Sequence, residues 1–185
     1  MFRKISSHSH LLYRLLLALC FIIFAAAVRI LPHPWNFTPV GAMALFSGAK
    51  LGRSWKAFVF PLVALFFGDL FVGFHRLMPV VYFSFSLSVL IGILFRHRQS
   101  FKPLAAATFL GALQFLLITN FGFWALTDAY PHTAAGLVAC YSAGIPHFGN
   151  TLAGDACYVL LFFGSFAVLE RFSPQPSDTT GLQTI

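Results

Sequence analysis

The sequence predicts an all-α membrane protein, a bundle of six transmembrane helices that forms a single domain over residues 1–172. Hydrophobic residues make up 58% of the 185 residues, charged residues only 9%, and the mean hydropathy is +0.81. A water-soluble domain of this composition would expose large apolar patches. At about 20 residues per transmembrane helix, a chain of this length accommodates roughly six. Residues 173–185 are polar and predict a disordered C-terminal tail.

Six apolar segments are the candidates for these helices. They are residues 11–31, 40–49, 57–74, 80–95, 104–127 and 147–169. The second, Val40–Ala49, is too short to cross alone, so we expect it to begin in Pro32–Pro39 or to extend into Leu51–Trp55. In the third, Pro61 predicts a kink. The first also resembles a secretory signal, but its apolar run continues past the small residues, so we expect residues 1–28 to be retained.

The lysine and arginine residues predict the orientation of the bundle. Ten of them fall in one set of connections: Arg3, Lys4, Arg14, Lys50, Arg53, Lys56, Arg96, Arg98, Lys102 and Arg171. The other set holds only Arg29 and Arg76. Because cytoplasmic loops carry the excess of basic residues, both termini are predicted to be cytoplasmic. The net charge of +7 is thus distributed as topology signals and lipid-headgroup contacts, which argues against nucleic acid as a partner.

Two of the five acidic residues, Asp69 and Asp155, lie inside apolar segments. A carboxylate inside a bilayer costs roughly 2.5–3.5 kcal/mol on insertion scales, and such groups usually face a polar cavity or a partner. Counted at about 1.5 Å per residue, Asp69, Asn120 and Asp155 lie roughly 8–12 Å below the outer ends of their spans. We therefore expect these three side chains to line one cavity in the outer half of the membrane.

The predicted outer connections are rich in aromatic, amide and imidazole groups. With the three buried groups they give the following candidate substrate-binding residues: Asn36, Asp69, His75, Asn120, Trp124, Tyr130, Tyr141, His147, Asn150 and Asp155. We expect the aspartates to anchor polar groups of a substrate, the asparagines to form hydrogen bonds, and Trp124, Tyr130 and Tyr141 to stack on it.

Two chemical alternatives are weaker. The seven histidines form no HxxxH or HExxH pair, so no metal or other cofactor is predicted. The pairs Gly68-Asp69 and Gly154-Asp155 resemble intramembrane aspartyl proteases, in which two carboxylates share a proton. Those enzymes have tyrosine where this chain has Gly68, and a glycine where it has Leu152. We therefore predict a protein that is not an enzyme, with a hydrolase using the two aspartates and a structural membrane subunit as the alternatives.

Four motifs carry a resemblance to a known family. They are Pro34-Trp35-Asn36-Phe37-Thr38-Pro39-Val40-Gly41-Ala42, Gly68-Asp69 with Gly73-Phe74-His75, Thr119-Asn120-Phe121-Gly122-Phe123-Trp124, and Asn150-Thr151-Leu152-Ala153-Gly154-Asp155. Together they resemble an uncharacterised family of bacterial membrane proteins described as transport proteins. That family is similar to the substrate-binding S components of energy-coupling-factor (ECF) vitamin transporters.

The resemblance implies a six-helix protein of the bacterial inner membrane that captures a small water-soluble nutrient or vitamin. It also implies an outward-facing pocket roofed by His33–Pro39, His75–Pro79 and Asp128–Pro146, and an ECF-type energising module as a partner. Some relatives bind cobalamin through a cysteine thiolate. This chain has no cysteine between Cys20 and Cys140, so cobalamin is not favoured. The chain has no GxxxxGK[ST] motif, so energy is expected from a partner or a gradient.

Overall fold

The structure is a computed structural model that describes residues 19–98 and 100–172, and this part of the chain is helical with no strand. The first helix covers Leu19–Ile30 in the described residues. The others are α2 (Val40–Leu51), α3 (Lys56–Val72), α4 (Met78–Phe95), α5 (Phe101–Leu126) and α6 (Ala134–Phe172). The fold class is therefore all-α, as predicted. The beginning of the first segment and the tail 173–185 lie outside the described residues.

Local sequence explains most of the helix ends. Helices α2 and α3 each stop at a glycine with positive φ, Gly52 (φ 62) and Gly73 (φ 102). A glycine adopts this left-handed conformation without the steric cost of a Cβ, which makes it a common helix terminator. Helix α4 has Pro79 in its first turn, where the missing N–H costs no helical hydrogen bond. The predicted bounds of the third, fourth and fifth segments differ from the structure by only a few residues.

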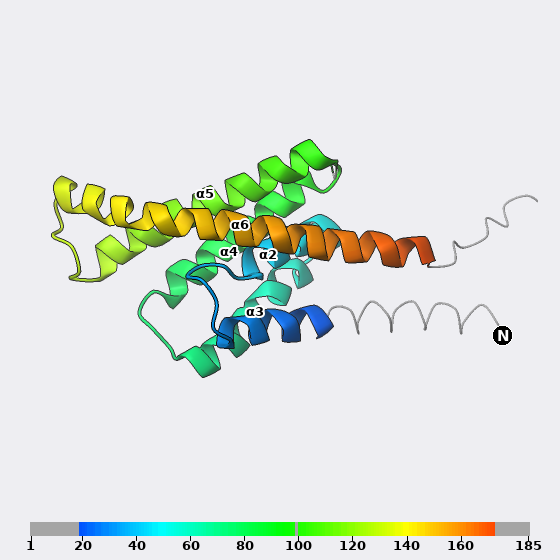
Figure 1. Ribbon diagram of the computed structural model, residues 1–185, viewed down its shortest axis with the longest axis horizontal. Helices are drawn as coiled ribbons and strands as arrows, with labels where there is room; N and C mark the ends of the chain where they lie inside the picture. The colour runs from blue at the N-terminus through cyan, green and yellow to red at the C-terminus, as the bar shows by residue number, and fades with distance from the viewer. Residues whose placement is uncertain (1–18, 99, 173–185) are drawn as a thin grey trace, which may run out of the picture.

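The sixth segment is longer than predicted. Helix α6 begins at Ala134, 13 residues before the expected His147, and contains Pro146 in its interior. The expected outer loop Asp128–Pro146 is therefore mostly helix, and only the residues before Ala134 connect α5 to α6. A proline is tolerated inside a helix when neighbouring groups satisfy the carbonyl it frees. Figure 1 shows α5 and α6 side by side as a long antiparallel hairpin.

Helix α2 lies at the centre of the bundle and contacts α3, α4, α5 and α6. Every residue from Val40 to Gly48 is buried. Its closest neighbour is α4, because a Cβ at Gly48 would lie 2.1 Å from the Val89 carbonyl oxygen, and one at Gly92 2.2 Å from that of Leu45. Small residues at such positions let two backbones approach closely. With 12 residues, about 18 Å, α2 is shorter than a bilayer but is enclosed by protein.

The packed core lies around the C-terminal half of α2. Phe162 of α6 is fully buried there, with its ring 4.5 Å from that of Phe21 in the first helix and 6.1 Å from that of Phe46. Centroid separations of this size are usual for favourable aromatic pairs. This cluster joins the first helix, α2 and α6 at one end of the bundle. The N-terminal end of α2 is built differently, from polar groups and open space.

Within residues 19–98 and 100–172, three helices are long and apolar enough to cross a membrane: α4, α5 and α6. Large apolar side chains point outward from them and from α3, with Phe71 71% exposed and Leu94 76% exposed. A water-soluble protein rarely exposes so much apolar surface, so the chain is a membrane protein. In Figure 1 the connections 73–77 and 127–133 lie toward one end of the bundle, and residues 96–98 lie toward the other.

Candidate functional site

Two adjoining cavities lie around the N-terminal end of α2. The first has a volume of about 140 Å³. Its lining comes from the first helix, the segment 31–39, α2, α4, α5, α6 and the α3–α4 connection: Arg29, Asn36, Thr38, Gly41, His75, Val81, Phe85, Ser88, Gly111, Phe115, Thr151 and Asp155. Small-molecule sites of membrane bundles are commonly built in this way, from a few polar groups on facing helices.

The second cavity has a volume of about 170 Å³ and lies between α5 and α6. Its lining is Asn36, Leu77, Phe115, Leu116, Thr119, Asn120, Phe123, Gly144, His147, Phe148 and Thr151. The two cavities share Asn36, Phe115 and Thr151. They are therefore neighbours, separated by three side chains that come from three different parts of the chain.

Asn36 at this boundary has an unusual backbone. Its φ is 63°, the only positive value at a non-glycine residue in the described part of the chain. Asparagine adopts this conformation more readily than most residues, but it still costs free energy. A tight turn holds it, with Phe37 N–H donating to Pro34 O at 3.0 Å and Thr38 N–H to Asn36 O at 3.1 Å. The strained turn places Asn36 in the lining of both cavities.

Asp155 lies where α2 begins. It is 4% exposed, lines the first cavity, and accepts a hydrogen bond from the Ala42 N–H in the first turn of α2. Such N–H groups have no partner within their own helix. Gly41 makes this approach possible, because a Cβ there would lie 2.3 Å from Asp155 Oδ1. The Pro-Val-Gly-Ala motif and the Gly-Asp motif of α6 thus meet in space.

The surroundings of Asp155 compensate its charge only in part. A helix N-terminus stabilises a carboxylate by about 0.3–2 kcal/mol. Placing the carboxylate in a bilayer costs roughly 2.5–3.5 kcal/mol even on the mildest scales. Within the described ranges, no basic side chain forms an ion pair with Asp155. The remaining cost has to be met by a proton or by a partner in the cavity.

Asp69 has different surroundings, and the prediction that it shares a cavity with Asn120 and Asp155 is wrong. It lines neither cavity. Arg29 forms an ion pair with its Oδ1, and Tyr82 Oη–H donates to its Oδ2 at 2.9 Å. Gly68 leaves room for the arginine, since a Cβ there would lie 2.4 Å from Arg29 Nε. Asp69 is thus a buried ion-pair partner that joins the first helix, α3 and α4.

Asn120 lines the second cavity instead, next to the α5–α6 contact. Its Nδ2 donates to Leu116 O at 2.8 Å, and its amide lies against Gly144, where a Cβ would be 2.5 Å from Oδ1. The Cys140 thiol lies 3.4 Å from the Asn120 carbonyl oxygen. The two histidines among the predicted binding residues line different cavities: His75 lines the first and His147 the second.

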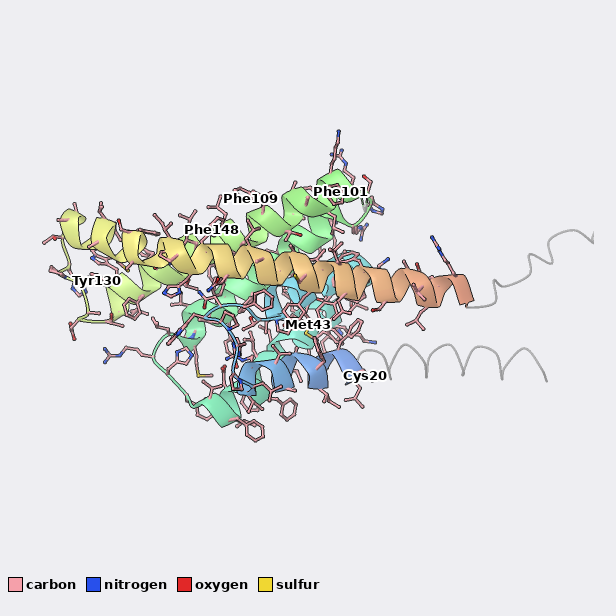
Figure 2. All side chains as sticks on the ribbon, viewed as in Figure 1. Cys20, Met43, Phe101, Phe109, Tyr130 and Phe148 are labelled. Atoms are coloured by element: carbon pink, nitrogen blue, oxygen red, sulfur yellow. The ribbon has the colours of Figure 1, made fainter. Side chains whose placement is uncertain are left out.

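The remaining four predicted residues lie outside the lining of both cavities: Trp124, Tyr130, Tyr141 and Asn150. Trp124 Nε1–H donates to Pro131 O at 2.9 Å, and Tyr141 Oη–H donates to Leu117 O at 2.7 Å. Tyr130 packs edge-on against Phe123 and lies at the tip of the hairpin in Figure 2, far from Met43 at the bundle centre. Trp124, Tyr130 and Tyr141 therefore stabilise the α5–α6 hairpin.

Several lining groups were not among the predicted site residues. The sequence indicates Arg29 only as a charge in a connection. Thr38 and Thr151 lie in two of the four motifs, but neither is among the predicted binding residues. Beside the first cavity, Gln114 Nε2 donates to Ser88 Oγ at 2.8 Å, while Ser84 Oγ–H donates to Gln114 Oε1 at 3.1 Å. A glutamine in the middle of an apolar segment was the available signal for this network. In the described residues, no group of three or more His, Cys, Asp or Glu is arranged to hold a metal ion.

Residues 9–176 match the profile of a protein family described as a family of unknown function, DUF6580. The chain belongs to this family. No curated protein and no solved structure matches it. The features of this DUF6580 member that bear on its function are the two cavities and the different surroundings of its two buried aspartates.

Proposed function

We propose that this protein captures a small water-soluble nutrient or vitamin at the outer side of a bacterial inner membrane, in the manner of an ECF S component. The observation that carries the proposal is Asp155, a buried carboxylate that lines a cavity inside an apolar bundle and has no basic partner in the described residues. Carboxylates inside membrane bundles commonly mark substrate or ion pathways.

The lining residues take distinct roles in this proposal. Asp155 anchors a polar group of the substrate in the first cavity, with His75 beside it. Asn36 forms a hydrogen bond to the substrate at the boundary, while Asn120 and His147 bind its other end in the second cavity. Asp69 does not touch the substrate but holds Arg29 in place.

Six crossings with both termini in the cytoplasm complete the proposal. The alternation of residues 73–77, 96–98 and 127–133 between the ends of the bundle supports it, together with the ten-to-two charge bias. In this arrangement α2 spans the bundle as a short helix enclosed by its neighbours. Transport would draw on an ECF-type energising module or on a gradient.

The hydrolase alternative is less well supported. An aspartyl dyad needs two carboxylates close enough to share a proton. Asp69 has both oxygens occupied by Arg29 and Tyr82, whereas Asp155 accepts from Ala42. No observation favours a structural subunit over a binding protein either, since a mere packing contact does not require a cavity beside the carboxylate.

The proposal is tested with the full chain purified in detergent. Mass spectrometry of co-purifying small molecules should detect a ligand in the wild type, and adding that ligand should raise the melting temperature. In Asp155→Asn the protein should still fold and the ligand-induced shift should disappear. Asp128→Asn, the same substitution in the exposed α5–α6 connection, is the control and should keep the shift. A ligand shift that survives Asp155→Asn would contradict the assigned role.

A further inference from the structure

The two buried aspartates differ in what balances their charge. The Asp69 carboxylate lies against the Arg29 guanidinium and receives the Tyr82 hydroxyl. Asp155 receives a backbone N–H from Ala42. Both residues are almost completely buried. Among the described residues, one carboxylate is therefore matched by a cation, and the other has no cation paired with it.

The titratable groups that line the first cavity are Arg29, His75 and Asp155. Arg29 is ion-paired with Asp69 through Nη2, and its Nε, which has no hydrogen-bond partner in the described residues, lies against Gly68 of α3. An anionic ligand would share this guanidinium with Asp69 and would also lie beside Asp155. A ligand with a positive charge would instead form an ion pair with Asp155, the charged group of the lining that has no cation paired with it in the described part of the chain.

The second cavity has a different chemistry. Its polar lining consists of the neutral groups of Asn36, Thr119, Asn120 and Thr151, with His147 as its titratable residue. Apolar rings of Phe115, Phe123 and Phe148 complete it. This combination suits a neutral ring or chain that carries hydrogen-bonding groups.

Together these features define a class of substrate. We propose that the ligand is an elongated organic cation whose protonated nitrogen pairs with Asp155 in the first cavity, while a neutral hydrogen-bonding group occupies the second. The inference rests on the proposed capture function. Each cavity has about the volume of a site that holds one benzene-sized group, roughly 150 Å³. The ligand thus has two compact parts, and the link between them passes Asn36 and Phe115.

The test is a thermal-shift screen of the full wild-type chain in detergent, with a set of water-soluble nutrients sorted into cations, neutral molecules and anions. We expect the stabilising compounds to be cations with a second, neutral polar group. Their affinity should fall at least tenfold in Asp155→Asn and stay unchanged in Asp128→Asn. If only neutral or anionic compounds stabilise the protein, the charge assignment is wrong although capture stands. If no compound stabilises it, both proposals fail.

A second measurement needs no variant. Dicyclohexylcarbodiimide reacts with a protonated carboxyl group in apolar surroundings: the acid proton moves to a carbodiimide nitrogen, the carboxyl oxygen bonds to the central carbon, and acyl migration gives a stable N-acylurea. Peptide mass spectrometry should locate the adduct on Asp155 rather than on Asp69. The stabilising cation should prevent it. Labelling of Asp155 that the cation does not reduce would overturn the inference.

Discussion

At the scale of single residues, Asp69 and Asp155 show how the same side chain serves two purposes in an apolar bundle. Asp69 is held by Arg29 and Tyr82, from two other helices. Removing one partner of a buried ion pair costs about 3–5 kcal/mol, because the other charge remains in a low-dielectric site. Asp155 has no such partner in the described residues, so removing its charge relieves a cost.

The ion pair gives the first prediction. Asp69→Asn should lower the free energy of unfolding by about 3–5 kcal/mol, because Arg29 then stays buried without a counter-charge. Arg29→Gln should destabilise the protein for the converse reason. The double variant should recover much of the loss, since no lone charge is left. Equilibrium unfolding in mixed detergent measures all four proteins. Additive losses in the double variant would show that the two side chains do not act as a pair.

Gly41 gives a second prediction at this scale. In Gly41→Ala the new Cβ would meet Asp155 Oδ1 at 2.3 Å and Cγ at 2.8 Å, so the carboxyl group must turn away from α2. We expect ligand affinity, measured by thermal shift, to fall at least tenfold. Gly149→Ala on α6 is the control, because nothing lies within 4 Å of its added Cβ. Equal ligand affinity in the two variants would contradict the assigned position of Asp155.

The sequence indicates how deep each polar residue lies along its helix, but not which residues of other helices it contacts there. Asp69 and Asp155 were recognised because a carboxylate in an apolar run is rare and costly. Arg29 lies 40 residues from Asp69, and only the packing of the first helix against α3 brings them together. The aromatic residues Trp124, Tyr130 and Tyr141 were chosen for their chemistry, which suits hairpin packing as well as ligand stacking.

At the scale of elements, α2 decides where the cavities lie. It is short, central and closely packed on α4 through Gly48 and Gly92. Because α2 begins inside the bundle, its unpaired N–H groups face protein rather than water, and Asp155 meets one of them. The open space above this end of α2 becomes the first cavity.

The close contact of α2 with α4 predicts that neither glycine tolerates a side chain. In Gly48→Ala and Gly92→Ala the added Cβ would approach a backbone carbonyl oxygen at 2.1 and 2.2 Å. Because backbone cannot rotate away, we expect each variant to lose about 1–3 kcal/mol or more of stability. Gly164→Ala in α6 has nothing within 4 Å and should be close to neutral. Unfolding curves that overlap for the three variants would refute the close packing.

Hydropathy predicts which segments are helical, and the flanking glycine, proline and charged residues indicate where α3, α4 and α5 end. The sequence does not indicate where α6 begins. Pro146 and the polar residues near it were interpreted as a loop, whereas α6 runs through them from Ala134. The proline removes the hydrogen bond to the carbonyl of Ser142, a cost that packing against α5 offsets. Such tertiary compensation leaves little signal in a single sequence.

At the scale of the whole molecule, the bundle has a packed aromatic end and a hollow polar end. The packed end contains the aromatic cluster of Phe21, Phe46 and Phe162. The two cavities lie at the other end, around the N-terminus of α2. In the proposed topology, the charge bias predicts that the cavity end faces the outside. Substrate would then reach the cavities from the periplasm.

Topology is checked with reporter fusions along the intact gene. Fusions after Gly52 and His97 should report the cytoplasm, and fusions after His75 and Asp128 the periplasm, as six crossings with internal termini require. An unfused chain with a C-terminal tag supplies the control for expression. A periplasmic signal at Gly52 would show that α2 does not count as a crossing.

The central claim, that Asp69 holds the bundle together and Asp155 serves the ligand, is tested most directly by one comparison. Asp69→Asn and Asp155→Asn are purified in the same detergent, and the melting temperature of each is measured with and without the ligand. Asp69→Asn should have a lower melting temperature than the wild type. Asp155→Asn should have an unchanged or higher melting temperature without any ligand-induced shift, because asparagine keeps the shape and the acceptor for Ala42. Equal destabilisation by both substitutions, with the ligand shift retained in Asp155→Asn, would contradict the central claim.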